Sequence, residues 1–302
     1  MDFQHLGGVY AAALTPLQEN FSPDLEAIPE YLAFLAGRGC HGALLLGTTG
    51  EGPSFATHER ISIFRAALKV REQFPDFRLL AGTGTPSLEE SAALTQGAFD
   101  LGFDGVVTLP PYYFRDASEE GLLRWFSEII QRSVPEDGAF LGYHFPNASG
   151  VALSTQLLSR LKDRFPRQFA GLKDSSGDPE HAQRLGHLFG ADLLILTGND
   201  RLFSMALDSG ASGCITAMAN LRSPDLRAVW DAYKNGEDKT SAQERLDRAR
   251  LVLDDYAPFA SSLKALLPST HDFPRWPLRP PLMPLSDDLM EMFVQAFSAT
   301  RK

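Results

Sequence analysis

The sequence predicts an α/β fold, a (β/α)8 TIM barrel with a C-terminal helical extension. Two observations favour this fold. Eight short apolar segments recur between residues 9 and 215, and amphipathic segments of helical character separate them. The short segments are apolar throughout, which is typical of parallel strands that helices cover on both faces. A doubly wound open sheet is the alternative, but no Gly-x-Gly-x-x-Gly motif follows the first apolar segment.

The predicted strands are these eight apolar segments. In chain order they are Val9–Leu14, Ala43–Leu46, Leu79–Gly82, Gly105–Leu109, Phe140–Tyr143, Ala170–Lys173, Leu193–Thr197 and Gly213–Ile215. The helices predicted to follow them are Leu25–Arg38, His58–Glu72, Leu88–Leu101, Glu119–Arg132, Thr155–Arg164, Glu180–Leu188 and Leu202–Ser209. Residues that favour helix N-caps precede several of these helices: Ser22-Pro23, Thr57, Ser87, Ser118, Ser154 and Asp178-Pro179.

The pattern turns helical after the eighth predicted strand. Ser241–Asp254 and Asp287–Phe297 have helical periodicity, and the proline-rich segment Pro274–Pro284 lies between them. We therefore expect two parts. Residues 1–222 form the barrel and carry the active site, and residues 223–302 form a helical region packed on the barrel.

Composition describes an acidic protein with a large core. Of its 302 residues 44% are hydrophobic, and the net charge of −10 argues against a nucleic-acid partner. The two cysteines, Cys40 and Cys214, lack metal-type spacing and suggest a reducing compartment. The N-terminus lacks signal-peptide features, and no apolar run approaches the ~20 residues that cross a bilayer. We expect a cytoplasmic protein without a membrane partner.

Lys173 is the most informative single residue. It closes the apolar strand Phe169–Leu172, and Asp174 follows at once. Desolvation of a lysine on a buried strand favours its neutral, nucleophilic amine, which is the setting of a Schiff-base lysine. A surface or salt-bridged lysine is the ordinary alternative.

Polar residues gather where the predicted strands end, which is where a barrel carries its chemistry. These ends are Gly47–Glu51, Thr83–Thr85, Pro110–Tyr113, Tyr143-His144, Lys173–Ser175, Gly198–Asp200 and Thr216. They offer one amine, several hydroxyls, three phenols and many backbone donors. A His/Asp/Glu cluster for a catalytic metal is not evident in them. The set predicts carbonyl chemistry through an imine, with no metal.

Each of these polar residues also has a structural interpretation. Gly47–Glu51 fits a tight turn as well as an anion-binding nest. Tyr113 and Tyr143 fit core aromatics, and Asn199 and Asp200 fit a helix cap. For His144 and Glu51 we favour structural roles, in the case of Glu51 either an interaction with a helix dipole or a salt bridge. Compatible groups at so many strand ends together favour an active site.

The sequence resembles the dihydrodipicolinate synthase / N-acetylneuraminate lyase superfamily of pyruvate-dependent class I aldolases. The resemblance runs from Gly8–Pro16 to Leu278–Leu285. Its most specific motifs, in matching order and spacing, are Gly47-Thr48-Thr49-Gly50-Glu51, Ala81-Gly82-Thr83-Gly84, Pro110-Pro111-Tyr112-Tyr113, Tyr143-His144-Phe145-Pro146 and Gly171-Leu172-Lys173-Asp174.

The resemblance implies a role for each catalytic residue. Lys173 forms an imine with the C2 carbonyl of pyruvate or of a 2-oxo acid, so no cofactor is needed. Thr48 and Thr49 hold the pyruvate carboxylate. Tyr143 stands over the imine and moves protons, and Tyr113 reaches across a dimer interface to complete a Tyr143–Thr48–Tyr113 relay. The resemblance also implies a homodimer or a homotetramer.

The resemblance supplies further substrate-binding positions. They are Gly47, Ala148, Ser175, Gly198, Asn199, Asp200 and Ile215, the last through its backbone carbonyl near the lysine.

Three positions distinguish the branches of the superfamily. Dihydrodipicolinate synthases carry an arginine where this chain has Ala148, and alanine cannot bind a carboxylate in bidentate fashion. N-acetylneuraminate lyases carry Asp-Glu where this chain has Asp200-Arg201, which argues against sialic acid. Arg201 fits a substrate with an additional anionic group or a surface salt bridge. The motifs around Tyr143 and Lys173 look most like those of 2-keto-3-deoxy sugar acid aldolases, with His144 in place of an asparagine.

The sequence therefore predicts a lyase that reversibly cleaves a 2-oxo-3-deoxy acid to pyruvate and an aldehyde. The first alternative is a dihydrodipicolinate synthase that joins pyruvate to aspartate semialdehyde. A dehydratase or decarboxylase uses the same imine. A non-catalytic module that binds pyruvate or a sugar acid is the alternative of another class, because a fold alone does not guarantee activity.

Overall fold

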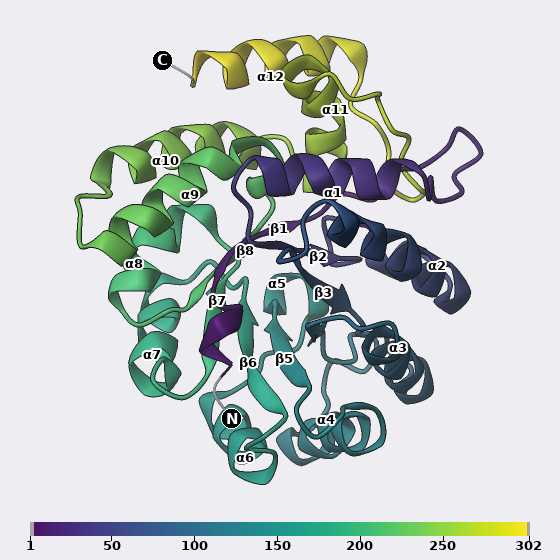
Figure 1. Ribbon diagram of the computed structural model, residues 1–302, viewed down its shortest axis with the longest axis vertical. Coiled ribbons are helices and arrows are strands. Elements are labelled where there is room, and N and C mark those ends of the chain that lie inside the picture. Colours follow the sequence, from purple (N-terminus) through teal and green to yellow (C-terminus); the bar gives the residue numbers. More distant parts are fainter. Residues whose placement is uncertain (1–2, 301–302) are drawn as a thin grey trace. The chain divides into compact units, whose positions relative to one another are not determined.

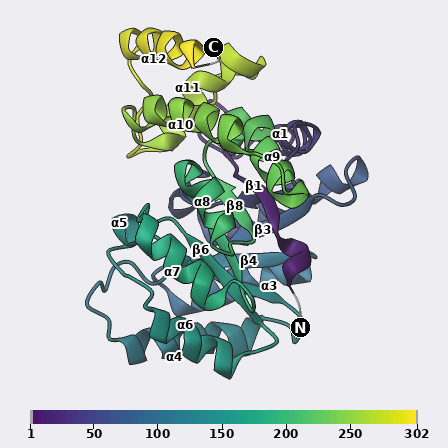
Figure 2. The same cartoon turned by 90° about the vertical axis from the view of Figure 1, so that its left-hand side faces the viewer.

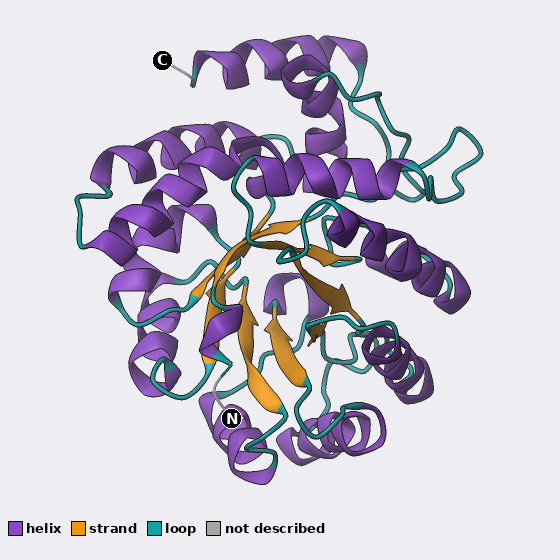
Figure 3. Ribbon diagram, in the orientation of Figure 1, coloured by secondary structure: helices purple, strands orange, loops and turns teal. Residues whose placement is uncertain are grey.

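The computed structural model describes residues 3–300 and shows a closed barrel of eight strands in the order β1 to β8 (Figure 3). The strands are β1 (Gly8–Ala12), β2 (Gly42–Leu45), β3 (Arg78–Gly82), β4 (Gly105–Thr108), β5 (Ala139–His144), β6 (Phe169–Asp174), β7 (Leu194–Thr197) and β8 (Gly213–Thr216). All eight predicted strands are present, and the predicted barrel is confirmed. Apart from Arg78 every strand residue is buried, as expected of strands with side chains covered on both faces.

The chain forms two compact units. The first contains Met1–Gly8 and Arg78–Ile215, and the second contains Val9–Phe77 and Thr216–Lys302. The boundary predicted between residues 222 and 223 falls inside a helix and stays a prediction.

The first unit contains strands β3 to β8 and the helices that connect them. These are η1 (Gln4–Leu6), α3 (Leu88–Asp100), α4 (Glu119–Ser133), α5 (Pro146–Ser149), α6 (Thr155–Arg164), α7 (Pro179–Phe189), η4 (Asp200–Leu202) and α8 (Phe203–Asp208). Figure 2 shows η1 and α5 at opposite ends of this unit. The loop that carries α5 therefore lies at the end where the strands finish, the end that bears the chemistry in barrels of this type.

The second unit contains β1, β2 and the remaining helices (Figure 1). These are α1 (Ala27–Gly37), η2 (Gly52–Ser54), α2 (Thr57–Ala67), η3 (Leu68–Glu72), α9 (Ala219–Asn235), α10 (Thr240–Asp254), α11 (Phe259–His271) and α12 (Asp287–Ala299). The sequence did not predict α9 or α11. Pro224 and a non-helical Arg222 interrupt the pattern of α9, and residues 260–267 of α11 are all buried, so no polar face marks it as a helix.

Four of the predicted N-caps are confirmed, and two are wrong. The side chains of Ser87, Ser118, Ser154 and Asp178 accept hydrogen bonds from the first turns of α3, α4, α6 and α7. Before α1 it is the Asp24 carboxylate, not Ser22, that accepts bonds from backbone N–H groups. Thr57 is the first residue of α2 instead of its cap.

None of the helices within residues 3–300 is long and apolar enough to cross a membrane.

Candidate active site

Lys173 and Tyr143 lie side by side on neighbouring parallel strands. The register of β5 and β6 pairs their Cα atoms directly, and both side chains are nearly fully buried. The Lys173 Nζ lies 4.2 Å from the centroid of the Tyr143 ring, a cation–π distance. A positive charge on this nitrogen is stabilised by the face of the phenol ring. The structure thus brings together the two residues predicted to form the imine and to move its protons.

Phe145 sets the orientation of the Tyr143 ring. The two rings stack with centroids 5.8 Å apart and an interplanar angle of 23°. Because side chains alternate along a strand, Tyr143 and His144 point to opposite sides of β5, and Lys173 and Asp174 do the same on β6. One side of this strand pair therefore carries the lysine and the phenol.

The ends of β6 and β7 form a polar rim beside these residues. The Ser175 N–H donates to the His144 carbonyl over 2.8 Å, and the Gly198 N–H donates to the Asp174 carbonyl over 2.6 Å. A Cβ at Gly198 would lie 1.9 Å from the Ser175 hydroxyl oxygen, so glycine is required there for the serine to occupy its place.

Asn199 and Asp200 follow this rim, as the cap and the first residue of η4. The Asn199 side chain accepts the Arg201 N–H as a helix cap, and Asp200 is fully buried. The cap interpretation of Asn199 that the sequence left open is therefore realised. Ile215 is also fully buried, in β8.

Ala148 lies in α5 and is exposed. The loop around α5 is held internally by the buried Ser149, whose hydroxyl donates to the carbonyls of Phe145 and Val151. The Arg115 side chain crosses the end of this loop at Gly150: a Cβ at Gly150, whose φ is +70°, would lie 2.5 Å from the Arg115 Cδ. Sequence reasoning did not single out Arg115.

Tyr113 does not join the buried pair. It lies in the loop after β4 and is 76% exposed, and the next residue, Phe114, is 73% exposed. Their rings contact each other edge to face at 5.2 Å. Tyr113 is therefore not a core aromatic within the chain.

The turn Gly47–Glu51 belongs to the second unit. The Gly52 N–H donates to the Gly47 carbonyl and the Glu51 N–H to the Thr48 carbonyl, and the Thr15 hydroxyl donates to the Gly50 carbonyl over 2.7 Å. Glu51 has left-handed backbone angles with φ of +57°, which is strained for a residue with a side chain and must be stabilised by its surroundings.

Buried ionic contacts provide that stabilisation. One Glu51 carboxylate oxygen accepts from Lys264 Nζ over 2.5 Å, and the other accepts from the Arg279 N–H over 2.9 Å. Both the lysine and the glutamate are almost completely buried. Burial lowers the pKa of Lys264, and the adjacent Glu51 charge opposes that shift. The salt-bridge interpretation of Glu51 is therefore the one the structure shows.

Beside the strand ends lies a His/Asp cluster that the sequence analysis did not identify, and the expectation that the site holds no metal stays a prediction. His144, Asp174 and His181 place potential ligand atoms within 4.8 Å of one another. The rings of the two histidines stack with centroids 4.6 Å apart. His181 escaped sequence reasoning because it comes from the first turn of α7. Its only signal was its position three residues after the cap Asp178.

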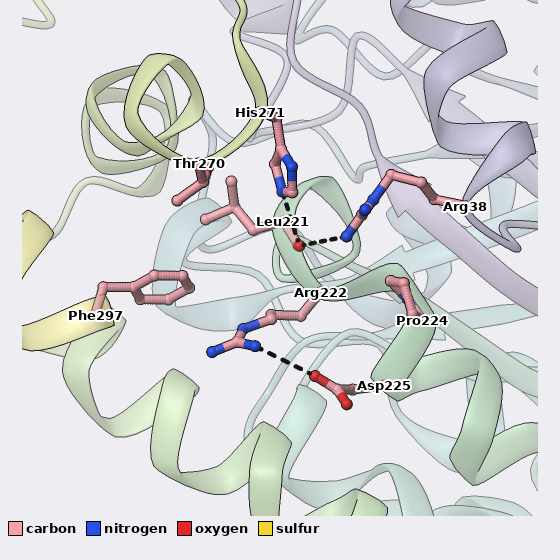
Figure 4. A pocket seen from close by; sticks show the side chains of 8 residues that line it. All are labelled: Arg38, Leu221, Arg222, Pro224, Asp225, Thr270, His271 and Phe297. Carbon is pink, nitrogen blue, oxygen red and sulfur yellow. Dashed lines mark hydrogen bonds and ion pairs between the residues drawn. The ribbon is translucent and has the colours of Figure 1, made fainter. Parts of the chain in front are cut away.

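A separate cavity of about 390 Å³ lies within the second unit (Figure 4). Its lining comprises Arg38, Leu221, Arg222, Pro224, Asp225, Thr270, His271 and Phe297, none of which was a predicted site residue. Figure 4 shows Arg38 and His271 converging on the Leu221 carbonyl at the kink of α9, with contacts of 3.3 and 3.1 Å. These side chains join α1 and α11 to α9.

The sequence and the fold of this chain were compared with those of known proteins. Residues 5–300 match the dihydrodipicolinate synthetase family. The chain belongs to that family. A DapA-like lyase of Chloroflexus aurantiacus, itself named as uncharacterized, is 41% identical over 93% of this chain and 92% of the relative. A 4-hydroxy-tetrahydrodipicolinate synthase of Corynebacterium urealyticum is 34% identical over 78% of this chain and 75% of the relative.

Solved structures of the dihydrodipicolinate synthetase family share the fold. Dihydrodipicolinate synthase from Agrobacterium tumefaciens superposes with a TM-score of 0.88 at 29% identity, covering 98% of this chain and 99% of that chain. Ruminococcus gnavus sialic acid aldolase, as a catalytic lysine mutant, superposes with a TM-score of 0.88 at 19% identity, covering 100% and 99%, and shows the fold alone. The predicted family and the predicted enzyme class, a carbon–carbon lyase, are confirmed.

Proposed function

We propose that this enzyme is a class I aldolase that reversibly cleaves a 2-oxo-3-deoxy acid to pyruvate and an aldehyde through an imine on Lys173. The observation that carries this proposal is the buried amine of Lys173, paired in register with Tyr143 and 4.2 Å from its ring. A desolvated lysine beside a phenol is the chemistry that imine formation and proton transfer require.

The cleavage proceeds through four steps. The Lys173 amine adds to the C2 carbonyl, and Tyr143 gives its phenol proton to the departing water, which leaves an iminium and a tyrosinate. The tyrosinate takes the proton of the C4 hydroxyl while the C3–C4 bonding electrons move into the iminium, so that an aldehyde departs and an enamine remains. Tyr143 returns this proton to C3 of the enamine, and water then hydrolyses the iminium to pyruvate and the free lysine, with the released proton going back to the tyrosinate. The Tyr143 ring stabilises the cationic intermediate.

The other site residues keep their predicted roles within this proposal. Thr48 and Thr49 bind the pyruvate carboxylate, Gly47 and Ile215 offer backbone groups to the pyruvate part, and Thr48 joins Tyr113 in the relay. The exposure of Tyr113 and Phe114 supports a homodimer in which Tyr113 serves the partner subunit, because adjacent exposed aromatics are typical of interfaces.

Ser175 and Asn199 support a hydroxylated aldehyde part. Ser175 directly follows β6 and Asn199 comes two residues after β7. A Cβ at Gly198 would meet the Ser175 hydroxyl, and a Cβ at Gly177 would lie 3.3 Å from the Asn199 amide nitrogen. Ala148 leaves room for a bulky polyol but provides no charge for a carboxylate. Dihydrodipicolinate synthase activity is the second candidate, favoured by the 34% identity to a named synthase.

Borohydride trapping with pyruvate tests the imine. Two lysines within residues 3–300 are almost completely buried, Lys173 and Lys264, and the second is held by Glu51 and the Pro277 carbonyl. We expect peptide mapping to find a reduced pyruvate adduct on Lys173 and none on Lys264, which serves as an internal control. A folded protein without an adduct on Lys173 contradicts the proposal and favours a pyruvate-binding module.

A panel of aldehydes tests the second substrate. With pyruvate, we expect carbon–carbon bond formation with hydroxylated aldehydes and little or none with aspartate semialdehyde. Turnover with aspartate semialdehyde alone would establish the synthase instead. Product masses also separate the aldolase from a dehydratase, because loss of water keeps the carbon count and aldol cleavage does not.

A further inference from the structure

His144, Asp174 and His181 form a compact group behind the catalytic pair, which we term the imidazole cluster. The register of β5 and β6 pairs His144 with Asp174, one residue after it pairs Tyr143 with Lys173. His144 and Asp174 are 4% and 3% exposed. His181 stacks on His144 at an interplanar angle of 29°, and its Nε2 is buried without a hydrogen-bond partner among the described residues.

The hydrogen bond at His144 defines its protonation. The Leu153 N–H donates to His144 Nδ1 over 3.0 Å in a buried environment. An Nδ1 that accepts carries no proton, so the neutral ring holds its proton on Nε2. A metal ion on Nε2 requires the proton to move to Nδ1, because a metal-bound histidine donates through its other nitrogen. Two donors would then face each other at Leu153, so this geometry favours a neutral histidine over a metal ligand.

The Leu153 bond closes the loop that follows the catalytic tyrosine. The loop begins with Phe145, which stacks on Tyr143, contains the short helix α5, and returns at Val151 and Leu153, both buried. Within it, Ser149 bonds to Phe145 and Val151. The loop is therefore held together by its own hydrogen bonds, and His144 joins its returning end to strand β5.

We propose that His144 is a positioning residue whose neutral imidazole holds the loop 145–153 beside Tyr143 and so determines the affinity for the aldehyde part of the substrate. The proposal rests on the aldolase function proposed above. It separates two parts of the site: Lys173 forms the imine with pyruvate from its own strand, whereas the part of the substrate beyond C3 depends on the clamped loop that carries Ala148.

The charges around His144 make the clamp sensitive to pH. Burial lowers the pKa of His144, the Asp174 carboxylate on β6 raises it, and His181 on α7 lowers it. Protonation of His144 adds a proton to Nδ1 and removes the acceptor of the Leu153 N–H. The clamp is therefore complete above the ordinary histidine pKa of about 6.5 and is lost as the pH falls through the lowered pKa in the folded protein.

Two substitutions separate the role of the hydrogen bond from that of the ring. In His144→Asn the side-chain oxygen can accept the Leu153 N–H, whereas in His144→Leu nothing can. We expect both variants to form the pyruvate adduct on Lys173 as the parent does. We expect His144→Leu to raise KM for the 2-oxo-3-deoxy acid about tenfold, the usual effect of orphaning a buried donor. His144→Asn should stay within about twofold of the parent and lose the rise of KM at acid pH.

Other outcomes overturn the proposal. A parental KM in His144→Leu, or an equal loss in both variants, shows that the Leu153 bond does not set the affinity. Histidine nitrogen NMR on the parent protein gives a readout that does not depend on how the variants fold: we expect a neutral ring with the proton on Nε2 at neutral pH, assigned by its absence in His144→Asn. An imidazolium, or one equivalent of bound Zn²⁺ that His181→Gln abolishes, contradicts the neutral clamp. If the parent protein itself forms no pyruvate adduct on Lys173, the proposed aldolase function is wrong, and this outcome is distinct from a failure of the His144 proposal alone.

Discussion

Two regions of the molecule support predicted site residues with opposite chemistry. The turn Gly47–Glu51 rests on charge: the buried Glu51 carboxylate binds the Lys264 ammonium and the Arg279 backbone. The strand ends that carry Tyr143 and Lys173 rest instead on the imidazole cluster, in which the key contact is a backbone N–H donating to a neutral ring. The first region is fixed by groups that must remain ionised, and the second by a group that must remain neutral.

The difference teaches what each region can tolerate. A buried ion pair contributes little net stability, but removing one partner leaves an uncompensated charge. Breaking a hydrogen bond between neutral groups costs less free energy. When the acceptor is a histidine ring, the bond is lost once that ring takes up a proton. The turn should therefore fail by unfolding, whereas the strand ends should fail by losing substrate affinity in a folded enzyme.

The largest expected effect is on the charged region. Lys264→Met leaves the buried Glu51 carboxylate without its cation, and we expect a loss of about 3–5 kcal/mol in the free energy of unfolding. Denaturant unfolding measures it. The double variant Glu51→Gln, Lys264→Met removes both charges and should recover part of the loss. His181→Gln, the comparison in the neutral region, should cost less than about 1 kcal/mol. Equal losses in Lys264→Met and His181→Gln would remove the distinction between the regions.

A second ionic contact extends the charged region and gives it an acid limit. The Arg279 guanidinium donates two hydrogen bonds to Glu59, of 2.8 and 2.5 Å, and holds the pKa of that carboxyl down at about 2. A carboxyl whose pKa is lowered by folding stabilises the fold at any pH above its ordinary pKa. This stabilisation is lost as the pH falls toward the lowered pKa of the folded protein. We expect about 2 kcal/mol of stability to disappear between about pH 5 and about pH 2, after allowance for partial exposure.

Unfolding measured across that pH range checks the acid limit. Glu59→Gln should flatten the profile. The matched control is Glu89→Gln, because Glu89 pairs with Arg132 on the open surface, and its loss should leave the profile unchanged. A profile that responds equally to both substitutions would mean that general charge, not the Arg279 contact, sets the acid limit.

The sequence predicted the barrel because its signal is local. Each strand is a short apolar run. The predicted strands ended at Tyr143 and at Lys173, and the register of β5 and β6 pairs these two residues. α11 could not be predicted in this way, since residues 260–267 are buried on every side and lack helical periodicity in their polarity. The contacts that support the site are equally non-local: Glu51 and Lys264 are 213 positions apart.

His144 shows the limit of residue-by-residue reasoning at the site. Sequence reasoning favoured a structural role for His144, which agrees with its hydrogen bond to Leu153. Its partners could not be inferred, because His181, in the first turn of α7, stacks on the His144 ring only in the folded chain. Recognising the cluster required knowing that residues next to the catalytic pair on two strands share one side of the sheet.

The smallest expected effect is a pair of opposite shifts in the neutral region. Because the Asp174 charge raises the pKa of His144 and His181 lowers it, Asp174→Asn should lower that pKa and His181→Gln should raise it. The pH at which KM for the 2-oxo-3-deoxy acid rises should then move down in the first variant and up in the second. An asparagine oxygen can keep the bond from the Ser176 N–H that Asp174 accepts, so the local turn is preserved.

Histidine NMR titration and KM measured across the same pH range check these shifts together. Shifts of the same sign in the two variants would mean that altered burial, and not the two neighbouring charges, governs His144. A KM profile that stays fixed while the titration of His144 moves would separate the imidazole cluster from substrate affinity. If the KM profile moves with the titration of His144, down in Asp174→Asn and up in His181→Gln, the protonation of this buried ring controls the affinity for the aldehyde part of the substrate. The charged turn should show no such dependence.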